Sequence, residues 1–538
     1  MNRKTLVLPA IIGLLAPVLA ACGGSDSGDA SGDAIKVGTT DRFIASGKVP
    51  APFDPAYAYD TGSWNVLRQT VQTLMAMPRS GSGEPVPEAA QSCIFSDSGS
   101  ERYACKLRKD LKFADGKPIT AADVKYSIDR VRNIKSDSGS YGLLSSIDTI
   151  ETQGDREVIF HLKSPDATFP YKLATPSAGI VDPDEYPKNK LRNGFKVNGS
   201  GPYTLKASVK DDAVVKTVFT KNPNYKGQLK PKNDKVELDS FTDADAMGKA
   251  LEKGDIDMMT RTMSPDQIKR YSNHTGSAPK NINLVEMPGM EIRYLGFDTK
   301  ASTVRDKAVR QAMAQLVDRG ELASKVYGTG AEPLYSLVPS GITGHQNSFF
   351  NKYGDPSRSK AASILQQANI HTPVKLTLHY TSDHYGSGTK KEFELLQKQL
   401  NASGLFHVDI KGDVWDTYRD AQLKGKYDVY GLGWFPDFPD ADNFLAPFLD
   451  KDNFLSSPYA NSQIRGDLIP AERREADRLT ASKPIQQIQN VVADDVPVLP
   501  LWQGKQYVAA RDDITGVEWA LSASSVLQLW ELGRGVSG

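Results

Sequence analysis

Apolar positions recur with helical spacing in four long segments of the chain, which predicts an amphipathic helix in each. The segments are residues 58–75, 120–131, 304–327 and 390–400. The third has the most regular apolar face, with Ser302 or Thr303 as the expected cap and Gly328 after its end. Thr120 and Asp123 give the second the pattern of a capping box.

Short apolar runs bounded by turn residues predict strands between these helices. The runs are residues 35–39, 92–95, 103–107, 158–162, 427–434 and 496–501. Helices and strands alternate irregularly, and no repeat of fixed period is visible. The pattern therefore predicts an α/β or mixed fold.

The apolar run at the N-terminus predicts an export signal. Arg3 and Lys4 precede an apolar stretch over residues 5–18, and small residues follow it. The stretch is too short and wrongly flanked for a stable transmembrane helix, and no later segment approaches the roughly 20 apolar residues of a membrane span. We therefore expect residues 1–21 to be removed on export.

The end of this signal, Leu19-Ala20-Ala21-Cys22, resembles a bacterial lipobox. The resemblance implies that Cys22 is lipidated and becomes the mature N-terminus. Residues 22–34, rich in Gly, Ser, Asp and Ala, are expected to be a flexible tether. Acyl chains on Cys22 would hold the body at the outer face of the cytoplasmic membrane. The alternative is an ordinary secretory signal that happens to end near a cysteine.

Size and charge narrow the class of protein. The chain has 538 residues, of which 39% are hydrophobic and 24% charged, which suits two or three globular domains. Without the signal the chain has 63 basic and 65 acidic residues, a net charge of −2. A balance near zero argues against nucleic acid or an anionic bilayer as the main partner.

Two cysteines remain after Cys22, and their spacing predicts a disulfide. Cys93 and Cys105 lie in two expected strands around a turn centred on Gly99. A symmetric hairpin places them opposite each other, where cross-strand side chains are about 4.5–5.5 Å apart. An even pair in an exported protein favours a structural bridge over a metal site.

Four blocks in fixed order resemble the family 5 extracytoplasmic solute-binding proteins, the peptide/nickel group that serves ATP-binding cassette (ABC) importers. The blocks are residues 103–127, 198–203, 295–312 and 427–445. The first contains Asp115-Gly116-Lys117-Pro118 before the Thr120 capping pattern, and the last ends in Asn443-Phe444-Leu445. Together they span nearly all of residues 35–538.

The resemblance implies a two-lobed periplasmic-binding-protein fold of the Venus-flytrap, class II type, with a small extra domain on the first lobe. The expected first lobe is residues 35–66, 189–282 and 499–538. The extra domain is 67–188 and the second lobe 283–498. The resemblance also implies a monomer without a cofactor, which binds oligopeptides in the cleft and passes them to permease subunits coupled to cytoplasmic ATPase subunits.

The resemblance also supplies candidate ligand-binding residues. Gly433-Trp434-Phe435-Pro436-Asp437 matches a motif whose aspartate holds the α-ammonium of a bound peptide. This implies that Asp437 provides a charge-assisted contact for a desolvated cation. Trp434 and Trp415 are expected as aromatic walls, which tolerate side chains of varied shape.

Each candidate has a structural alternative. Asp437 could cap a turn, and Trp434 and Trp415 could pack in a core. A calcium site at Asp437, Asp440 and Asp442 is disfavoured, because the glycine and the distal glutamate of an EF-hand loop are missing.

The partner of the ligand carboxylate is not assigned by the motif. Residues 429–432 hold no basic residue, and pairing through Arg261, Arg293 or Arg419 stays open.

Other functions remain as alternatives. The same cleft could hold an oligosaccharide, a nickel chelate, for which His379 and His384 are the nearest histidine pair, or another solute. A peptide-signal receptor would need only the same cleft. A secreted hydrolase is disfavoured, since neither Gly-x-Ser-x-Gly nor His-Glu-x-x-His occurs. We therefore expect a binding protein and not an enzyme.

Overall fold

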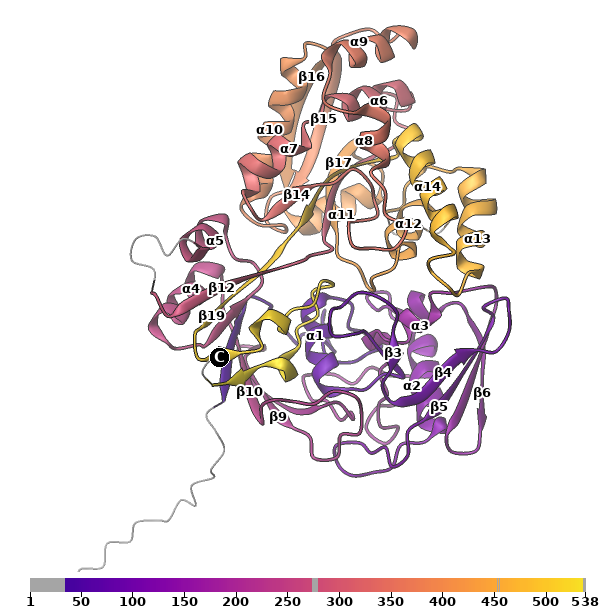
Figure 1. Cartoon of the computed structure of the whole chain (residues 1–538), viewed down its shortest axis with the longest axis vertical. Helices are drawn as coiled ribbons and strands as arrows, with labels where there is room; N and C mark the ends of the chain where they lie inside the picture. Colours follow the sequence, from indigo (N-terminus) through magenta and orange to yellow (C-terminus); the bar gives the residue numbers. More distant parts are fainter. Residues whose placement is uncertain (1–33, 273–278, 452, 454, 536–538) are drawn as a thin grey trace, which may run out of the picture.

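The computed structural model describes residues 34–272, 279–451, 453 and 455–535 (Figure 1). The expected signal, Cys22 and nearly all of the tether lie outside this part of the chain. Within the described residues, the helices are all too short or too polar to cross a membrane. The described chain is a mixed helix-and-sheet protein with two large sheets and one smaller sheet, each with its own core.

The first lobe is built on a seven-stranded sheet in the order β12-β19-β11-β1-β10-β9-β8. Its strands are β1 (Ile35–Thr39), β8 (Tyr203–Lys210), β9 (Ala213–Lys221), β10 (Lys235–Ser240), β11 (Met258–Thr260), β12 (Ile282–Met287) and β19 (Gln506–Arg511). Its helices are α1 (Thr61–Thr70), α4 (Ala244–Lys253) and α5 (Pro265–Ser272), and the short strands β20 (Ile514–Thr515) and β21 (Gly533–Arg534) pair beside it. Trp64 and Leu67 of α1 share one core with Val37 of β1, so the helix is fixed on this lobe.

The second lobe is built on a six-stranded sheet in the order β14-β18-β13-β17-β15-β16. Its strands are β13 (Ile292–Phe297), β14 (Ala331–Pro333), β15 (Val374–Thr381), β16 (Phe406–Asp413), β17 (Val429–Trp434) and β18 (Val498–Gly504). Its helices are α6 (Lys307–Leu316), α7 (Arg319–Leu322), α8 (Ser348–Tyr353), α9 (Arg358–Gln367), α10 (Gly388–Ala402), α11 (Trp415–Leu423), α12 (Asp442–Leu449), α13 (Ile469–Arg474) and α14 (Ser482–Asp495). In Figure 1 this lobe forms the upper body, and the ends of α12 and α13 point toward the lower one.

A small extra domain, at the lower right of Figure 1, carries a four-stranded sheet in the order β4-β5-β7-β6. Its strands are β4 (Ala90–Phe95), β5 (Arg102–Leu107), β6 (Ile147–Gln153) and β7 (Glu157–Leu162), with helices α2 (Ala121–Ile134) and α3 (Phe169–Lys172). The strands β2 (Met75–Ala76) and β3 (Val86–Pro87) form a separate pair. The capping box predicted for α2 is present at Thr120 and Asp123.

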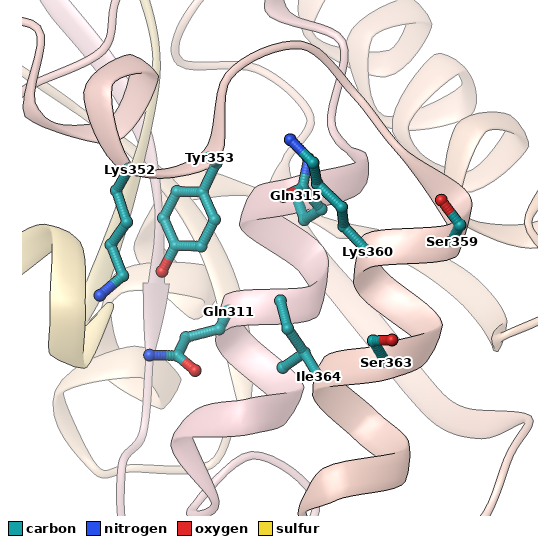
Figure 2. A pocket seen from close by; sticks show the side chains of 8 residues that line it. All are labelled: Gln311, Gln315, Lys352, Tyr353, Ser359, Lys360, Ser363 and Ile364. Carbon is teal, nitrogen blue, oxygen red and sulfur yellow. The ribbon is translucent and has the colours of Figure 1, made fainter.

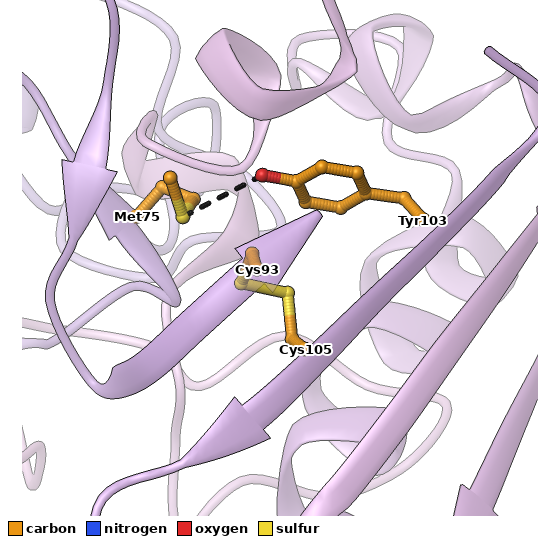
Figure 3. The surroundings of a disulfide bond; sticks show 4 residues. All are labelled: Met75, Cys93, Tyr103 and Cys105. Carbon is orange, nitrogen blue, oxygen red and sulfur yellow. Dashed lines mark hydrogen bonds between the residues drawn. A yellow bond between two sulfur atoms is a disulfide. The ribbon is translucent and has the colours of Figure 1, made fainter. Parts of the chain in front are cut away.

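The two cysteines of this domain are joined as their spacing predicts. Cys93 lies opposite Cys105 in the β4–β5 register, and a disulfide links them. Figure 3 shows the bridge beside Tyr103, whose hydroxyl donates to the sulfur of Met75 at 3.8 Å. The bridge therefore fastens the edge strand β4 to the domain's core.

The chain passes between the two large sheets twice, and the two crossings run together. β12 leads into β13, and β18 leads into β19. β12 pairs with β19 in the first sheet, and β13 pairs with β18 in the second. The Gly504 amide donates to the Glu291 carbonyl at 2.9 Å between them. The lobes are therefore joined by a narrow two-stranded ribbon.

The predicted domain division stays a prediction, and three of its limits fall inside a strand or a helix. The crossings lie at 288–291 and at residue 505, rather than at 283 and 499, because β12 and β18 each complete the sheet that they belong to. The predicted limit after residue 66 falls inside α1, which packs as one unit in the first-lobe core as far as Val71.

Two predicted helices are wrong in extent. The segment 304–327 is not one helix but α6, α7 and a π-helical turn over Ala323–Tyr327, which ends at Gly328 as predicted. Val317 is extended between them, and Asp318 starts α7 by accepting from the Glu321 amide. The cap of α6 is Asp306, not Ser302 or Thr303.

The segment 58–75 is helical only over α1, from an Asp60 cap to Thr70. Val71 is extended, and Met75 belongs to β2. In α1 and in α6 the helix starts at a short polar side chain, Asp60 or Asp306, which accepts from a free amide of the first turn.

Candidate functional site

Three aspartates follow β17, and the structure gives them different surroundings. Arg478 holds both carboxylate oxygens of Asp440, at 2.7 and 2.9 Å, and Arg473 holds Asp442 at 3.1 Å. Asp437 has no basic side chain within 4 Å among the described residues. Asp440 and Asp442 are thus used in buried ion pairs, and Asp437 retains a carboxylate without a counter-ion.

Polar neutral groups hold the Asp437 side chain in place. The Tyr59 hydroxyl donates to its Oδ2 at 3.1 Å, and the Asn443 amide donates to the same oxygen at 3.2 Å. Asn443 also accepts from the Asp437 backbone amide at 2.8 Å. Because Tyr59 precedes α1 of the first lobe, these bonds place Asp437 where the two lobes meet.

Burial raises the pKa of Asp437 to about 6, although the bonds from Asn443 and Tyr59 and the charge of Arg68 act in the opposite direction. The carboxylate is therefore ionised at neutral pH but poorly compensated. A cation brought to hydrogen-bond distance would replace its missing counter-ion. The arrangement suits recognition of an ammonium group.

Trp434 lies in the core of the second lobe rather than at a surface. Its side chain is 7% exposed, and its ring packs edge-on against Phe448 with the centroids 5.8 Å apart. The indole nitrogen faces the side-chain oxygen of Asn443 at 3.4 Å. Trp434 thus contacts the same amide that orients Asp437, and a direct contact with ligand stays a prediction.

Trp415 stands in a cluster of rings at the start of α11. Its indole stacks on His384 at 3.7 Å between centroids, and Tyr385 lies edge-on at 5.8 Å. Burial, aided by the charge of Arg293, lowers the pKa of His384 to about 4, so this imidazole is neutral at pH 7. The cluster offers broad apolar ring surface.

Two of the three arginines considered for the ligand carboxylate already have acidic partners. Arg261 pairs with Asp41 at 2.8 Å. Arg293 pairs with Glu291, and its guanidinium lies 4.0 Å from the ring centre of Tyr385.

A side chain at Gly433, opposite Arg293 in the β13–β17 register, would collide with this guanidinium at 2.1 Å. Glycine at that point of the motif therefore leaves the guanidinium in its observed place.

Arg419, the third of these arginines, lies on α11 and donates to Gln422. Burial lowers its pKa, opposed by the neighbouring hydroxyls of Tyr294 and Tyr385. Arg419 therefore belongs to the tyrosine-rich interior beside the Trp415 cluster.

The sequence motifs missed a row of side chains on the first lobe. Tyr59 contacts Trp64 with ring centroids 5.6 Å apart, and the guanidinium of Arg68 lies 5.2 Å from the Trp64 ring centre. The spacing of Trp64 and Arg68, one helical turn apart on α1, could be read from the sequence. Their nearness to Asp437 could not, because it depends on the folding of the other lobe.

The extra domain also contacts the second lobe, at the end of α13 and at the loop that carries Asp437. The Ala167 amide donates to the Arg473 carbonyl at 2.8 Å, and the Ser100 hydroxyl donates to the Arg474 carbonyl at 3.0 Å. The rings of Tyr171 and Phe438 lie 5.8 Å apart. All three bodies of the protein therefore meet around residues 437–442.

A cavity of about 510 Å³ lies elsewhere, between α6, α8 and α9 (Figure 2). It is lined by Gln311, Gln315, Lys352, Tyr353, Ser359, Lys360, Ser363 and Ile364. None of the sequence-predicted site residues borders it. It is therefore a separate feature from the Asp437 site.

The histidine pair considered for nickel is divided between two stacks. His379 lies on Tyr427 at 4.0 Å between centroids, whereas His384 lies on Trp415. In the part of the chain that the structure describes, no three His, Cys, Asp or Glu side chains are grouped to hold a metal ion.

Comparison with known proteins is consistent over most of the chain. The model of the bacterial extracellular solute-binding proteins, family 5, matches residues 84–456. The probable D,D-dipeptide-binding periplasmic protein DdpA of Escherichia coli K12 is 26% identical over 87% of this chain and 89% of its own. The glutathione-binding protein GsiB of Salmonella choleraesuis is 26% identical over 88% and 91%.

Solved structures have the same fold. The periplasmic binding protein DppA of Helicobacter pylori, in complex with the peptide STSA, superposes with a TM-score of 0.76. It is 22% identical, and the match covers 94% of this chain and 98% of that protein. The two-lobed arrangement with an extra domain is thus the periplasmic-binding-protein fold expected from the sequence.

Proposed function

Because the chain belongs to family 5 of the bacterial extracellular solute-binding proteins, we propose that it captures peptides between its two lobes and delivers them to an ABC importer. Members of the family bind solutes and are not enzymes. The names of the relatives, which bind dipeptides or glutathione, support a small peptide as the ligand.

One observation carries the proposal. Of the three aspartates that follow β17, Asp437 alone has no arginine or lysine within 4 Å among the described residues. Its neighbours Tyr59 and Asn443 orient it without neutralising it. A peptide's α-ammonium supplies the charge that this half-buried carboxylate lacks, so Asp437 is the proposed ammonium anchor.

The cluster of Trp415, His384 and Tyr385 is proposed to receive ligand side chains. Stacked rings give contact area with few directional demands. This suits an importer that accepts peptides of varied sequence. Trp434 is proposed to act indirectly. It contacts Asn443, and the Asn443 amide holds the Asp437 carboxylate.

Binding is proposed to favour the closed arrangement of the lobes. Tyr59 of the first lobe bonds Asp437 of the second, so a ligand seated there contacts both. A ligand that binds the closed form better shifts the population toward it. The permease is proposed to recognise that form.

We further propose that the mature protein is a monomer tethered by lipid on Cys22 to the outer face of the cytoplasmic membrane. The lipobox-like sequence and the Gly- and Ser-rich tether support this placement. The tether lets the body reach the permease while the acyl chains keep it near the membrane.

Calorimetric titration of the purified protein tests the function. Di- and tripeptides with free N-termini should bind at micromolar Kd or below, and their N-acetylated forms should bind at least tenfold more weakly. Asp437→Asn should remove this difference. Binding of chitooligosaccharides or Ni²⁺ with no response to peptides would replace the peptide by another solute.

A further inference from the structure

Arg68 is the one basic residue whose charge acts on Asp437 across the junction of the lobes, among the described residues. It lies on α1, and its guanidinium rests over the ring of Trp64. Trp64 in turn contacts Tyr59, whose hydroxyl reaches Asp437. The two charged groups thus lie at the ends of one continuous row of contacts.

The guanidinium of Arg68 has no hydrogen-bond acceptor and no carboxylate within 4 Å in the described part of the chain. Its side chain is nevertheless half-buried on a helix whose other residues are mostly buried. Burial lowers the pKa of Arg68 to about 10, against the charge of Asp437. An arginine that has lost water without gaining a carboxylate or a hydrogen-bond acceptor is ready to bind an anion.

Asp437 and Arg68 are further apart than an ion pair, and the contacts of Trp64 and Tyr59 link them. A ligand with both charges can place its ammonium against the aspartate and its carboxylate against the arginine. Each protein charge then obtains an oppositely charged partner at hydrogen-bond distance, and positive and negative groups alternate along the row.

We propose that Arg68 binds the carboxylate of the peptide whose ammonium is held by Asp437. This inference rests on the proposed function and deepens it. Because both termini are read at one junction, the ligand class is a short zwitterionic peptide, of about dipeptide length, with a free carboxyl end. Longer peptides whose carboxylate lies far from their ammonium do not satisfy Arg68.

Two of the other arginines considered for the ligand carboxylate already form ion pairs with acidic residues. Arg261 is neutralised by Asp41, and Arg293 by Glu291. Arg68 also differs from Arg293, which lies in the same lobe as Asp437, since Arg68 belongs to the first lobe. A ligand bound by both residues therefore connects the lobes, and its carboxylate contributes directly to closure.

The test is a calorimetric titration with three probes: a dipeptide, its C-terminal amide and its N-acetyl derivative. The wild-type protein should bind the free acid at least tenfold more tightly than the amide. Arg68→Gln should bind acid and amide alike, yet still reject the N-acetyl form. Arg68→Lys should retain part of the preference for the acid, and the exposed Arg305→Gln should behave as wild type.

Equal wild-type binding of acid and amide would overturn the role of Arg68 while leaving peptide capture intact. A full preference for the acid in a folded Arg68→Gln protein would do the same. Failure of all three probes to bind the wild type would remove the proposed function and this inference with it. The wild-type comparison needs no variant, so it can overturn the proposal even if Arg68→Gln does not fold, and Arg68→Lys then tests the assignment to this residue.

Discussion

The hydroxyl of Tyr59 donates a 3.1 Å hydrogen bond to Oδ2 of Asp437, across 378 positions of sequence and from one lobe to the other. Tyr59 is 38% exposed, so its contact with Asp437 can open to solvent. The bond occupies one oxygen of the carboxylate and supplies no charge. The junction is therefore closed by a neutral donor at a point where a cation would bind more strongly.

We expect Asp437→Asn to stabilise the ligand-free protein above pH 6. Burial raises the pKa of Asp437 from 3.8 to about 6, so the native state holds this proton more tightly than the unfolded chain. That stabilisation is complete below pH 3.8 and is lost as the pH rises through about 6. Asparagine does not ionise and avoids the loss.

Scanning calorimetry of both proteins without ligand checks this. At pH 7.5 the variant should melt about 2 °C higher than wild type, and at pH 4 the two should agree. A lower melting temperature for Asp437→Asn at pH 7.5 would show that the carboxylate has a partner that stabilises it.

Peptide affinity should depend on pH through the same group. Below about pH 6 the carboxylate of Asp437 is protonated, and the apparent Kd should rise about tenfold per pH unit. Binding near pH 6 should release a proton, because the ammonium favours the ionised form. Titrations in two buffers of different ionisation enthalpy measure this release, which should be absent in Asp437→Asn.

Asp440 is the matched control for Asp437, and the same substitution should have the opposite effect. Asp440 and Arg478 are 4% and 5% exposed, and they form a bidentate pair. Asp440→Asn removes the charge of the carboxylate that the buried Arg478 guanidinium holds. Loss of one partner of a buried pair costs about 3–5 kcal/mol. Urea unfolding should show this loss, whereas peptide selectivity at the N-terminus should persist in the folded fraction.

The disulfide between Cys93 and Cys105 should stabilise the extra domain measurably. It closes a loop with a sequence separation of 12, for which the chain-entropy model gives about 3 kcal/mol. The Cys93→Ser and Cys105→Ser double variant should unfold at lower urea than wild type. Wild type measured with a reducing agent should match the variant, and an unchanged midpoint in both would contradict a stabilising role.

Cys22→Ser should release the protein from the membrane. Wild-type cells grown with an alkyne-labelled fatty acid should yield a labelled membrane protein, whereas the variant should be unlabelled and soluble after export. Both proteins should bind peptide equally, since the body is unchanged. Unlabelled wild-type protein in the soluble fraction would favour an ordinary secretory signal.

The sequence pattern predicted the helices and strands themselves better than the breaks between them. Alternation and helical spacing located β1, β7 and α10 closely, since each is bounded by clear breaks. The single helix expected over 304–327 failed because apolar spacing continues across Val317, while the break depends on capping by Asp318. A periodic face shows that residues share a core, not that the backbone between them is unbroken.

The motif singled out Asp437 as a candidate, and geometry was needed to distinguish its surroundings from those of the neighbouring aspartates. Asp437, Asp440 and Asp442 look alike in sequence, and only the positions of Arg473 and Arg478 distinguish them. These arginines follow more than 30 positions later, and nothing local couples them to the aspartates. The proposed role of Arg68 was not visible in the sequence, because it depends on a residue of the opposite lobe.

The strand β19 has a consequence for the order of events during export. It occupies an inner place in the first-lobe sheet, between β12 and β11, although it comes from residues 506–511. That sheet cannot be completed until nearly the whole polypeptide has been synthesised. A chain threading outward N-terminus first therefore remains without its finished first lobe during almost all of its passage, and the fold closes only on the far side of the membrane.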